Sequence, residues 1–588
     1  MSRKSKIVAA IVLAVFILAA VAGCGGSQVQ TEGSGNTGST TGTAATGTEA
    51  QKPEITLTLY GPASGGANGV VKNEVFNLIH DKLNINVDID FTYTVDKYKT
   101  MMASDSLPDL SYFSDPSITF DQFVKSGLAL ELDQLIETNG QNILKYAPAM
   151  VSYCRQYESS GTNKLYFLNH QTSVNQVLPA GSHVGPCIRW DYYKEIGAPV
   201  MKSDRDYVDV VAQILEKYPT NEDGKRNVGI SLWSDWGKWT PYCYGAYAKN
   251  LNETYWPLTL NKATNEIVEV YGENGQFKQG IEFMNYAYRK GVLDPDSFTQ
   301  KIGDVISKAN TAQIISTVLT IADDGTKYLQ SKGLSGKGYT SQLTPVNIAG
   351  SQNAFYYYTP TGRTPYWVIA HNTKYPDRCM DFLNLLFSPE FFMNVVNGVE
   401  GEDWTVDAEG NHRYTDKHYE RLKESGTDIF TKYGFGGFMS SWSFQDADIN
   451  PITGKPYNIM FEDPSYYDRN LNSVQKDILS YYNAKAPLDL IKMQYTDIPR
   501  DNSCVAWNAF SATVLPDELK LVDTNIGAYM DKQYVKLTMC KTEEEFKAEY
   551  AKTMEELNKL GLQKLQDFLM PKLQEALKMQ EEFFKSVK

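Results

Sequence analysis

Three tryptophans lie within seven residues, at Trp233, Trp236 and Trp239, with polar residues between them. Tyr242 and Tyr244 follow at once. Sugars present flat C–H faces and many hydroxyls, so a site that binds them needs aromatic surfaces beside planar polar groups. The spacing of these aromatics fits neither a buried helix stripe nor a clean buried strand. We therefore expect the three tryptophans and Tyr244 to contact a carbohydrate, with ordinary core packing as the competing interpretation.

A second group of candidates combines a charge with aromatic side chains. The aromatic run at 355–358 and Tyr366 flank Arg363, and Trp367 follows. A guanidinium next to aromatic rings offers hydrogen-bond donors and a stacking surface together, which suits a sugar. We expect Arg363 and Trp367 to reach the ligand from a segment that crosses between two domains.

The elements that must position these residues alternate between strand and helix. Residues 55–60 and 87–91 alternate at period two, which predicts strands, and helical spacing separates them. This βαβαβ rhythm favours a mainly parallel sheet with helices on both faces. Ligands of such sheets bind beyond the carboxyl ends of the strands. We therefore expect Tyr60, Ser114 and Asp115 at the ligand site, although Asp115 has the alternative role of capping the next helix.

Later segments continue in the same style. Residues 228–233 predict a strand that leads directly into the tryptophan cluster, and residues 277–290 carry apolar side chains at helical spacing. The last segment, 542–587, is charged and predicts a helical tail with one apolar stripe.

Length and charge narrow the class of protein. A chain of 588 residues is too long for one ordinary domain. Its formal net charge of −14 argues against a nucleic-acid partner, because phosphate backbones recruit an excess of Lys and Arg. The sequence contains none of the H-E-x-x-H, G-x-S-x-G and P-loop motifs. A glycosidase needs only two carboxylates about 5 to 9 Å apart, so a secreted carbohydrate-active enzyme stays open as an alternative.

The first residues predict export. A basic start is followed by an uncharged run at 7–22 and by Cys24 behind small residues, an ending that resembles the lipobox of bacterial lipoproteins. We expect a signal peptide at 1–23, acylation of Cys24, and a flexible Gly/Ser/Thr-rich tether at 24–52. This layout predicts a protein anchored by lipid at the extracellular face of the cell membrane. A plain signal peptide with a chance cysteine is the alternative.

The remaining cysteines form no C-x-x-C pair and lie far apart in the chain. Six cysteines allow 15 disulfide connectivities, and the sequence selects none of them. Buried free thiols are the alternative. These cysteines are Cys154, Cys187, Cys243, Cys379, Cys504 and Cys540.

A series of short patterns resembles one known family in the order in which its segments occur. They lie at residues 103–110, 127–136, 188–197, 288–296, 375–384 and 554–566. Together with the lipobox, these patterns resemble extracellular solute-binding protein family 1, in particular the long sugar-binding lipoproteins of ABC transporters found mainly in Gram-positive bacteria.

The resemblance implies an α/β fold of two lobes, of the type II periplasmic-binding-protein kind, with a ligand cleft between lobes joined by a hinge. We expect an N-terminal lobe of 53–180 plus about 300–350, and a C-terminal lobe of 181–299 plus about 351–588. It further implies a monomer without catalytic residues or cofactor that delivers an oligosaccharide to the membrane permease of an ABC importer. A peptide-binding lipoprotein is a further alternative.

Some members of the family carry a calcium-binding loop in the second lobe, and the matching stretch here departs from it. Aligning Gly224 with the turn glycine places Pro219 and Ile230 at the first and last ligand positions. Neither side chain carries an oxygen, which calcium requires there. With Asn221 and Asp223 alone remaining, we expect no metal at this loop.

Overall fold

The computed structural model describes most of the chain beyond the N-terminal segment. The described residues are 52–62, 66–115, 117–177, 187–242, 244, 251–252, 254, 256–317, 323–340, 356–425, 429–436, 439–440, 442–486, 489–490, 493 and 500–587. The predicted signal peptide, Cys24 and the tether as far as residue 51 lie outside them.

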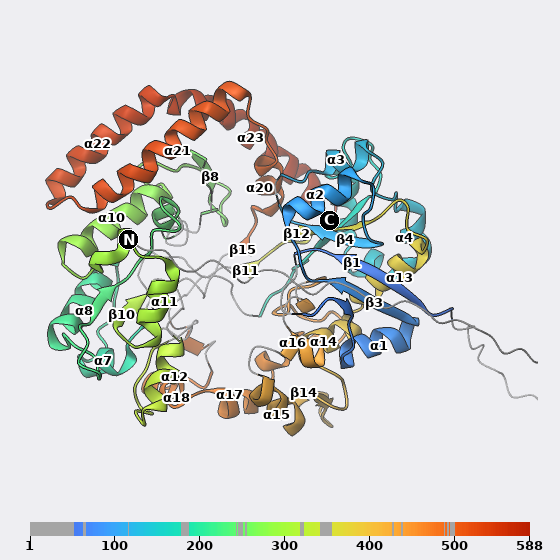
Figure 1. Cartoon of the computed structure of the whole chain (residues 1–588), viewed down its shortest axis with the longest axis horizontal. Coiled ribbons are helices and arrows are strands. Elements are labelled where there is room, and N and C mark those ends of the chain that lie inside the picture. The colour runs from blue at the N-terminus through green and yellow to red at the C-terminus, as the bar shows by residue number, and fades with distance from the viewer. Residues whose placement is uncertain are drawn as a thin grey trace, which may run out of the picture. The chain divides into compact units, whose positions relative to one another are not determined.

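The first lobe is built on a sheet which, within the described ranges, has six strands in the order β2-β3-β1-β4-β12-β5 (Figure 1). Strand β1 pairs in parallel with β3 and β4, whereas β12 runs antiparallel to both β4 and β5. The strands are β1 (Ile55–Tyr60), β2 (Gly69–Val70), β3 (Ile85–Asp90), β4 (Leu110–Phe113), β5 (Phe167–His170) and β12 (Arg363–Ile369).

Successive side chains of a strand point to opposite faces of the sheet. Both faces are buried at β4 and β5, whereas Thr56 and Thr58 of β1 are exposed. Trp367 and Ile369 of β12 belong to the core on one face, and Val368 to the core on the other. The first face is covered by α1 (Glu74–Leu83), α4 (Asp133–Asn139), α5 (Gln141–Tyr146), α6 (Pro148–Tyr157), α13 (Pro376–Leu386) and α14 (Pro389–Asn397). The opposite face is covered by α2 (Val95–Ala103) and α3 (Phe120–Lys125).

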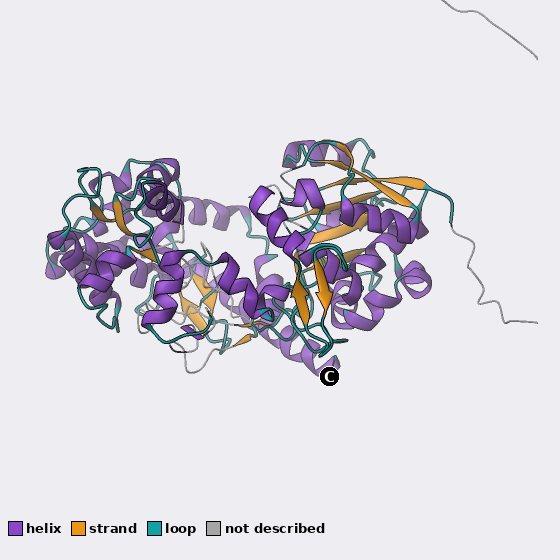
Figure 2. Ribbon diagram, turned by 90° about the horizontal axis from the view of Figure 1, so that it is seen from below, coloured by secondary structure: helices purple, strands orange, loops and turns teal. Residues whose placement is uncertain are grey.

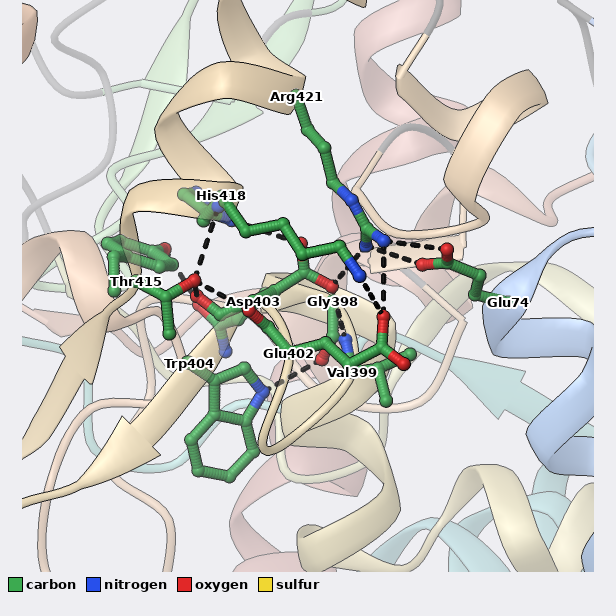
Figure 3. Close-up of polar contacts among 12 residues, drawn as sticks. Glu74, Gly398, Val399, Glu402, Asp403, Trp404, Thr415, His418 and Arg421 are labelled. Atoms are coloured by element: carbon green, nitrogen blue, oxygen red, sulfur yellow. Dashed lines mark hydrogen bonds and ion pairs between the residues drawn. The ribbon is translucent and has the colours of Figure 1, made fainter.

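A buried charge network fastens the later part of the first lobe to its first helix (Figure 3). The Arg421 guanidinium lies 2.7 Å from Asp403 Oδ2, 2.6 Å from Glu74 Oε1 and 3.2 Å from Glu402 Oε2. Asp403 is fully buried and also accepts the backbone N–H of Val399 at 2.8 Å. Arg421 therefore supplies the positive charge that permits a buried carboxylate at this point.

Arg421 of this network lies on α15 (Asp416–Ser425). The other elements of the first lobe that follow α14 in the chain are β13 (Trp404–Val406), β14 (His412–Tyr414), α16 (Ile429–Tyr433) and the short helix η4 (Ile459–Phe461).

The second lobe has its own sheet and core. Its described strands are ordered β6-β10-β7, with β10 parallel to β7 and antiparallel to β6. The sheet strands and a β8–β9 hairpin are β6 (Cys187–Ile188), β7 (Val228–Ile230), β8 (Leu258–Leu260), β9 (Ile267–Glu269) and β10 (Ile314–Thr317). The helices of this lobe are α7 (Trp190–Glu195), α8 (Asp204–Lys217), α10 (Gln276–Arg289), η1 (Pro295–Phe298), α11 (Ile302–Asn310), α12 (Asp323–Ser331), α18 (Ser473–Tyr481), α20 (Cys504–Ser511), α21 (Asp517–Thr538), α22 (Glu543–Leu560) and α23 (Leu562–Ser586).

Helices flank the strands in both lobes (Figure 2).

At the start of α7, the guanidinium of Arg189 is fully buried and donates to Asp191 at 2.9 and 2.8 Å and to Glu222 Oε1 at 2.8 Å. It also lies 4.0 Å from the ring centroid of Tyr192. A planar, always-charged donor is suited to this bidentate pairing, which joins α7 to the turn before β7.

The chain passes between the lobes after β5, before β12 and again after η4. Beside these passages, β11 (Tyr356–Tyr357) pairs with β15 (Arg500–Asp501), and α17 (Pro464–Asn470) lies between η4 and α18. A small core of Tyr153, Val505 and Phe583 joins α6 to the C-terminal helices. None of the described helices combines the length and apolar character that crossing a membrane requires.

Two segments lie in a different lobe from the one to which the sequence-based boundaries assigned them. Residues 300–350 were expected in the first lobe, but β10 pairs with β6 and β7 of the second. Residues from about 351 were expected in the second lobe, but β12 to η4 build the first. The alternation of apolar and polar residues predicts a strand but not the sheet to which the strand belongs. The partners of a strand depend on contacts between residues that are distant in the sequence.

We predict that Arg421→Ala lowers the free energy of unfolding by about 3–5 kcal/mol, because Asp403 loses its buried partner. His418 cannot replace it, since burial lowers the pKa of this histidine to about 3. Urea denaturation measures the loss. The matched control is Arg469→Ala, whose exposed pair with Asp416 should contribute less than about 1 kcal/mol. Equal effects of the two substitutions would contradict the assignment.

Candidate functional site

The carboxyl ends of β1, β4 and β5 and the start of β12 meet at one edge of the first-lobe sheet. Arg363 Nε donates to Gln171 Oε1, which also accepts from Gln445 Nε2 at 3.0 Å. Gln171 has a φ of 54°, in the left-handed region that side chains other than Gly rarely adopt. Such a conformation is held by its surroundings and is common where a side chain must be aimed.

The other residues predicted at this edge have local partners. The Tyr60 ring is buried beside Tyr93 and Tyr98, with centroids 5.4 and 5.9 Å away, and its hydroxyl accepts the Thr94 N–H at 3.0 Å. Ser114 is exposed, and Asp115 is half-buried.

Asp115 closes a turn. Its carboxylate accepts the side-chain O–H and the backbone N–H of Ser117, which hold its pKa below the usual range. The cap of the following helix is instead Thr119. Of the residues predicted here from sequence, the structure thus leaves Ser114, Asp115 and Arg363 at the surface of the edge.

Trp367, also predicted as a ligand contact, is a core residue. It is 1% exposed, and its ring centroid lies 5.0 Å from that of Tyr112, 4.9 Å from His170 and 5.2 Å from Trp442. Its position in β12 places it on the face of the sheet that is covered by α1, α4, α5, α6, α13 and α14. This location leaves its ring no open face for stacking on a sugar.

The tryptophan cluster follows the carboxyl end of β7, as the sequence predicted, but its members differ in exposure. Trp233 is 2% exposed, and its ring packs against Trp236 with centroids 4.9 Å apart at 79°. Trp239 is half-buried against the second-lobe core, and Tyr244 stacks on Phe283 at 4.1 Å. The packing of Trp233 and Tyr244 thus agrees with a role in the core, whereas Trp236 lines a cavity.

The cavity has a volume of about 420 Å³ and lies between the tryptophan cluster and helix α21. Its lining consists of Trp236, Lys238, Tyr271, Asp523, Ile526, Gly527 and Asp531.

The polar groups of this cavity carry both signs of charge. Lys238 Nζ lies 3.3 Å from Asp531 Oδ2, and a Cβ at Gly527 would stand 2.9 Å from the same ammonium. Burial raises the pKa of Asp523, while the Lys238 charge opposes that rise. The carboxylates can accept hydrogen bonds from the hydroxyls of a ligand, and the ammonium can donate hydrogen bonds to such hydroxyls. Both kinds of group lie next to the aromatic surface of Trp236. This combination suits a ligand with many hydroxyls.

Three of these residues could have been found in the sequence. Asp523, Gly527 and Asp531 are spaced by four residues, which places them on one face of α21. At Gly527, which lies between the two acids, a Cβ would stand 2.9 Å from the Lys238 ammonium, so the glycine leaves room for that group. No sequence signal identifies Gln171, because its backbone conformation is imposed by the fold.

The stretch that matches a calcium loop uses its oxygens within the protein. Asn221 Oδ1 accepts the backbone N–H groups of Asp223 and Lys225, both at 3.0 Å, and Glu222 pairs with Arg189. Across the described part of the chain, no cluster of three or more His, Cys, Asp or Glu side chains could hold a metal ion.

The described cysteines are free thiols, and Cys243 lies outside the described residues. The free thiols are Cys154, Cys187, Cys379, Cys504 and Cys540.

Comparison with known proteins places the fold. No family model and no curated protein sequence matches the chain. Solved structures do match: an N-glycan transport solute-binding protein from Streptococcus pneumoniae is 14% identical, with a TM-score of 0.52 over 91% of this chain and 100% of the other. An ABC-transporter substrate-binding protein of S. pneumoniae in complex with kestose is 15% identical, with a TM-score of 0.53 over 90% and 100%. The HMO-binding, ABC-transporter-associated solute-binding protein of Bifidobacterium longum infantis is 11% identical, with a TM-score of 0.53 over 88% and 98%.

At these identities the likeness concerns the fold. The chain has the two-lobe α/β fold of solute-binding proteins, as predicted from the resemblance.

Two buried carboxyls lie beside the segment that leaves the first lobe. Glu158 is 3% exposed and accepts from Asn169 Nδ2 at 3.1 Å, and the same amide donates to the Thr361 carbonyl at 3.0 Å. Burial raises the pKa of Glu158 to about 7. Asp448 accepts the Ser173 hydroxyl at 2.7 Å, and burial raises its pKa to about 6.

The raised pKa of Glu158 predicts a pH dependence of stability. In the unfolded chain its pKa is 4.5, so between pH 4.5 and 7 the folded state holds a proton that the unfolded state has lost. Stability therefore falls as pH rises through this window. Glu158→Gln should abolish that part of the fall and make the protein about 2–3 kcal/mol more stable than the wild type at pH 8, with little difference at pH 4.

Urea denaturation between pH 4 and pH 8 measures this difference. Glu131→Gln is the control, because Glu131 forms an exposed pair with Lys164. Parallel pH profiles for wild type and Glu158→Gln would show that folding does not raise the pKa of Glu158.

Proposed function

We propose that this protein is the substrate-binding lipoprotein of an ABC importer and that it binds an oligosaccharide between its lobes. We further propose membership of extracellular solute-binding protein family 1, in its long Gram-positive branch, and a non-catalytic role. The observation that carries the proposal is the second-lobe cavity, where Trp236 lies beside two carboxylates and an ammonium.

The fold supports this assignment of the cavity. The cavity lies beyond the carboxyl end of β7, where open α/β sheets bind their ligands. Proteins of similar fold include an N-glycan transport protein and one in complex with kestose. A sugar ring on Trp236 would bring its hydroxyls within reach of Asp523 and Asp531.

The first-lobe edge supplies the opposite half of the proposed site. Arg363 and Gln171 present donors and an acceptor there, and Asp115 follows the carboxyl end of β4 at the same edge of the sheet. A ligand that contacts both lobes binds the closed form more tightly than the open form, and this difference in affinity drives closure. The segments between the lobes would act as the hinge. The closed monomer would then dock on the membrane permease, and a separate subunit would hydrolyse ATP.

We predict that Trp236→Ala weakens binding of the best oligosaccharide at least tenfold, about 1.4 kcal/mol, because a stacking surface is lost. Isothermal titration of the protein with a panel of oligosaccharides and peptides measures this effect. Trp507→Ala is the control, since this half-buried residue packs near Phe510, away from the cavity. It should leave the affinity unchanged.

Other results would favour the alternatives. A peptide that binds when no glycan does would indicate a peptide-binding lipoprotein. A glycan recovered in cleaved form would indicate an enzyme. Equal affinities of wild type and Trp236→Ala for the glycan would remove the cavity from the ligand site.

The lipid anchor is a separate part of the proposal and rests on residues 1–24 of the sequence. We predict that Cys24→Ser moves the protein from the membrane fraction into the medium, because the acylated thiol is lost. Cell fractionation followed by immunoblotting measures the distribution. Cys504→Ser, at a free thiol of the globular part, should stay in the membrane fraction. Membrane retention of Cys24→Ser would contradict lipidation.

A further inference from the structure

The charged side chains that line the second-lobe cavity divide into one ion pair and one single carboxylate. Lys238 Nζ lies 3.3 Å from Asp531 Oδ2, so these two charges compensate each other. Asp523 makes no hydrogen bond and no ion pair with any described residue, although the Lys238 charge acts on it from farther away. The cavity therefore holds a negative charge for which the described part of the protein supplies no donor.

The spacing along α21 explains why Lys238 pairs with only one of the two carboxylates. Eight residues separate Asp523 from Asp531, which corresponds to about 12 Å along a helix axis. The Lys238 ammonium approaches the helix between them, where a Cβ at Gly527 would stand 2.9 Å away. From there it pairs with Asp531 and leaves the Asp523 carboxylate to another donor.

The surroundings of Asp523 make this unpaired charge costly. Asp523 is half-buried and lines the cavity together with Trp236 and Tyr271. Burial raises the pKa of the Asp523 carboxyl, as expected for a carboxylate that loses water without gaining a protein donor. Its oxygens are not among the unpaired side-chain atoms that the described fold seals from solvent, so a group in the cavity can reach them.

A protonated amine is the group that matches this wall best. An ammonium both donates hydrogen bonds to a carboxylate and compensates its charge, whereas a hydroxyl only donates. Cations also bind the faces of Trp and Tyr rings, and Trp236 and Tyr271 line the same cavity.

Tyr271 adds no negative charge of its own. Burial, together with the charges of Asp523 and Asp531, raises the pKa of its phenol well above the usual range. A carboxylate on the ligand, by contrast, would stand against Asp523 with the same sign of charge and would be disfavoured.

We propose that Asp523 is the specificity-determining residue of the second-lobe cavity and that it selects a glycan with a free amine, a 2-amino-2-deoxy sugar, over the N-acetylated and uronic-acid counterparts. The amine donates to Asp523 while the sugar ring lies on Trp236, and Lys238 and Asp531 bind ring hydroxyls. This inference rests on the proposed function, because it names the substrate class of the same cavity.

The test titrates the full-length, detergent-extracted protein with oligosaccharides of equal length: β-1,4-linked glucosamine oligomers, their N-acetylated forms and oligogalacturonates. Isothermal titration is done at pH 6, where an amine of this kind is protonated. The wild type should bind the glucosamine oligomers at least about tenfold more tightly than the N-acetylated forms, and the oligogalacturonates most weakly.

Asp523→Asn keeps the shape of the side chain and removes its charge. Because the carboxylate has no protein donor to lose among the described residues, the variant should fold normally, and its preference for the amine should fall to about twofold or less. Asp517→Asn is the matched control, since it removes the same charge from α21 at a side chain that is 96% exposed. It should keep the preference of the wild type.

The outcomes separate this inference from the proposed function. Equal affinity of the wild type for the free and N-acetylated amines, tighter binding of oligogalacturonates, or a full amine preference in Asp523→Asn would overturn the inference and leave oligosaccharide binding intact. Absence of binding by any glycan would contradict the proposed function itself. If Asp523→Asn does not fold, the comparison of the free and N-acetylated oligomers in the wild type decides alone.

Discussion

Strand β12 inserts between β4 and β5 of the first-lobe sheet, and this pairing governs how the rest of the chain is arranged. Because β12 is separated from β5 by the whole β6–β10 sheet, the chain must leave the first lobe and return to complete it. The insertion also places Arg363 next to the carboxyl ends of β4 and β5. The fold thus builds the edge of the proposed site and the passages between the lobes with the same strand.

Each lobe contains a buried pairing of an arginine with carboxylates. In the second lobe the Arg189 guanidinium is enclosed with Asp191 and Glu222, and in the first lobe Arg421 is enclosed with Asp403. Breaking such a pair is costly, whereas the pair itself adds little net stability, so its value lies in fixing one arrangement. Lobes that are internally rigid can move relative to each other without losing the geometry of their ligand-facing surfaces.

Much of the fold could be predicted from local sequence, and the site could be predicted in part. The strand expected at 55–60 is β1, and the helical tail expected at 542–587 is α22 and α23, divided at Gly561 with a φ of 105°. Hydrophobic periodicity depends only on residues near one another in the sequence, so it predicts these elements without knowledge of the fold.

The lobe to which each strand belongs and the exposure of each aromatic side chain depend on contacts between residues distant in the sequence. Local sequence patterns therefore could not predict them. Trp367 carries the same chemistry as Trp236, yet the strand pairing of β12 directs it into the core.

The central claim is that the protein captures intact oligosaccharides. Native mass spectrometry of the wild-type protein mixed with a library of neutral and acidic glycans and short peptides tests this claim most directly. The account predicts a one-to-one complex with a glycan whose released mass is unchanged. A complex with peptides alone, a released glycan of lower mass, or no complex with any glycan would contradict it.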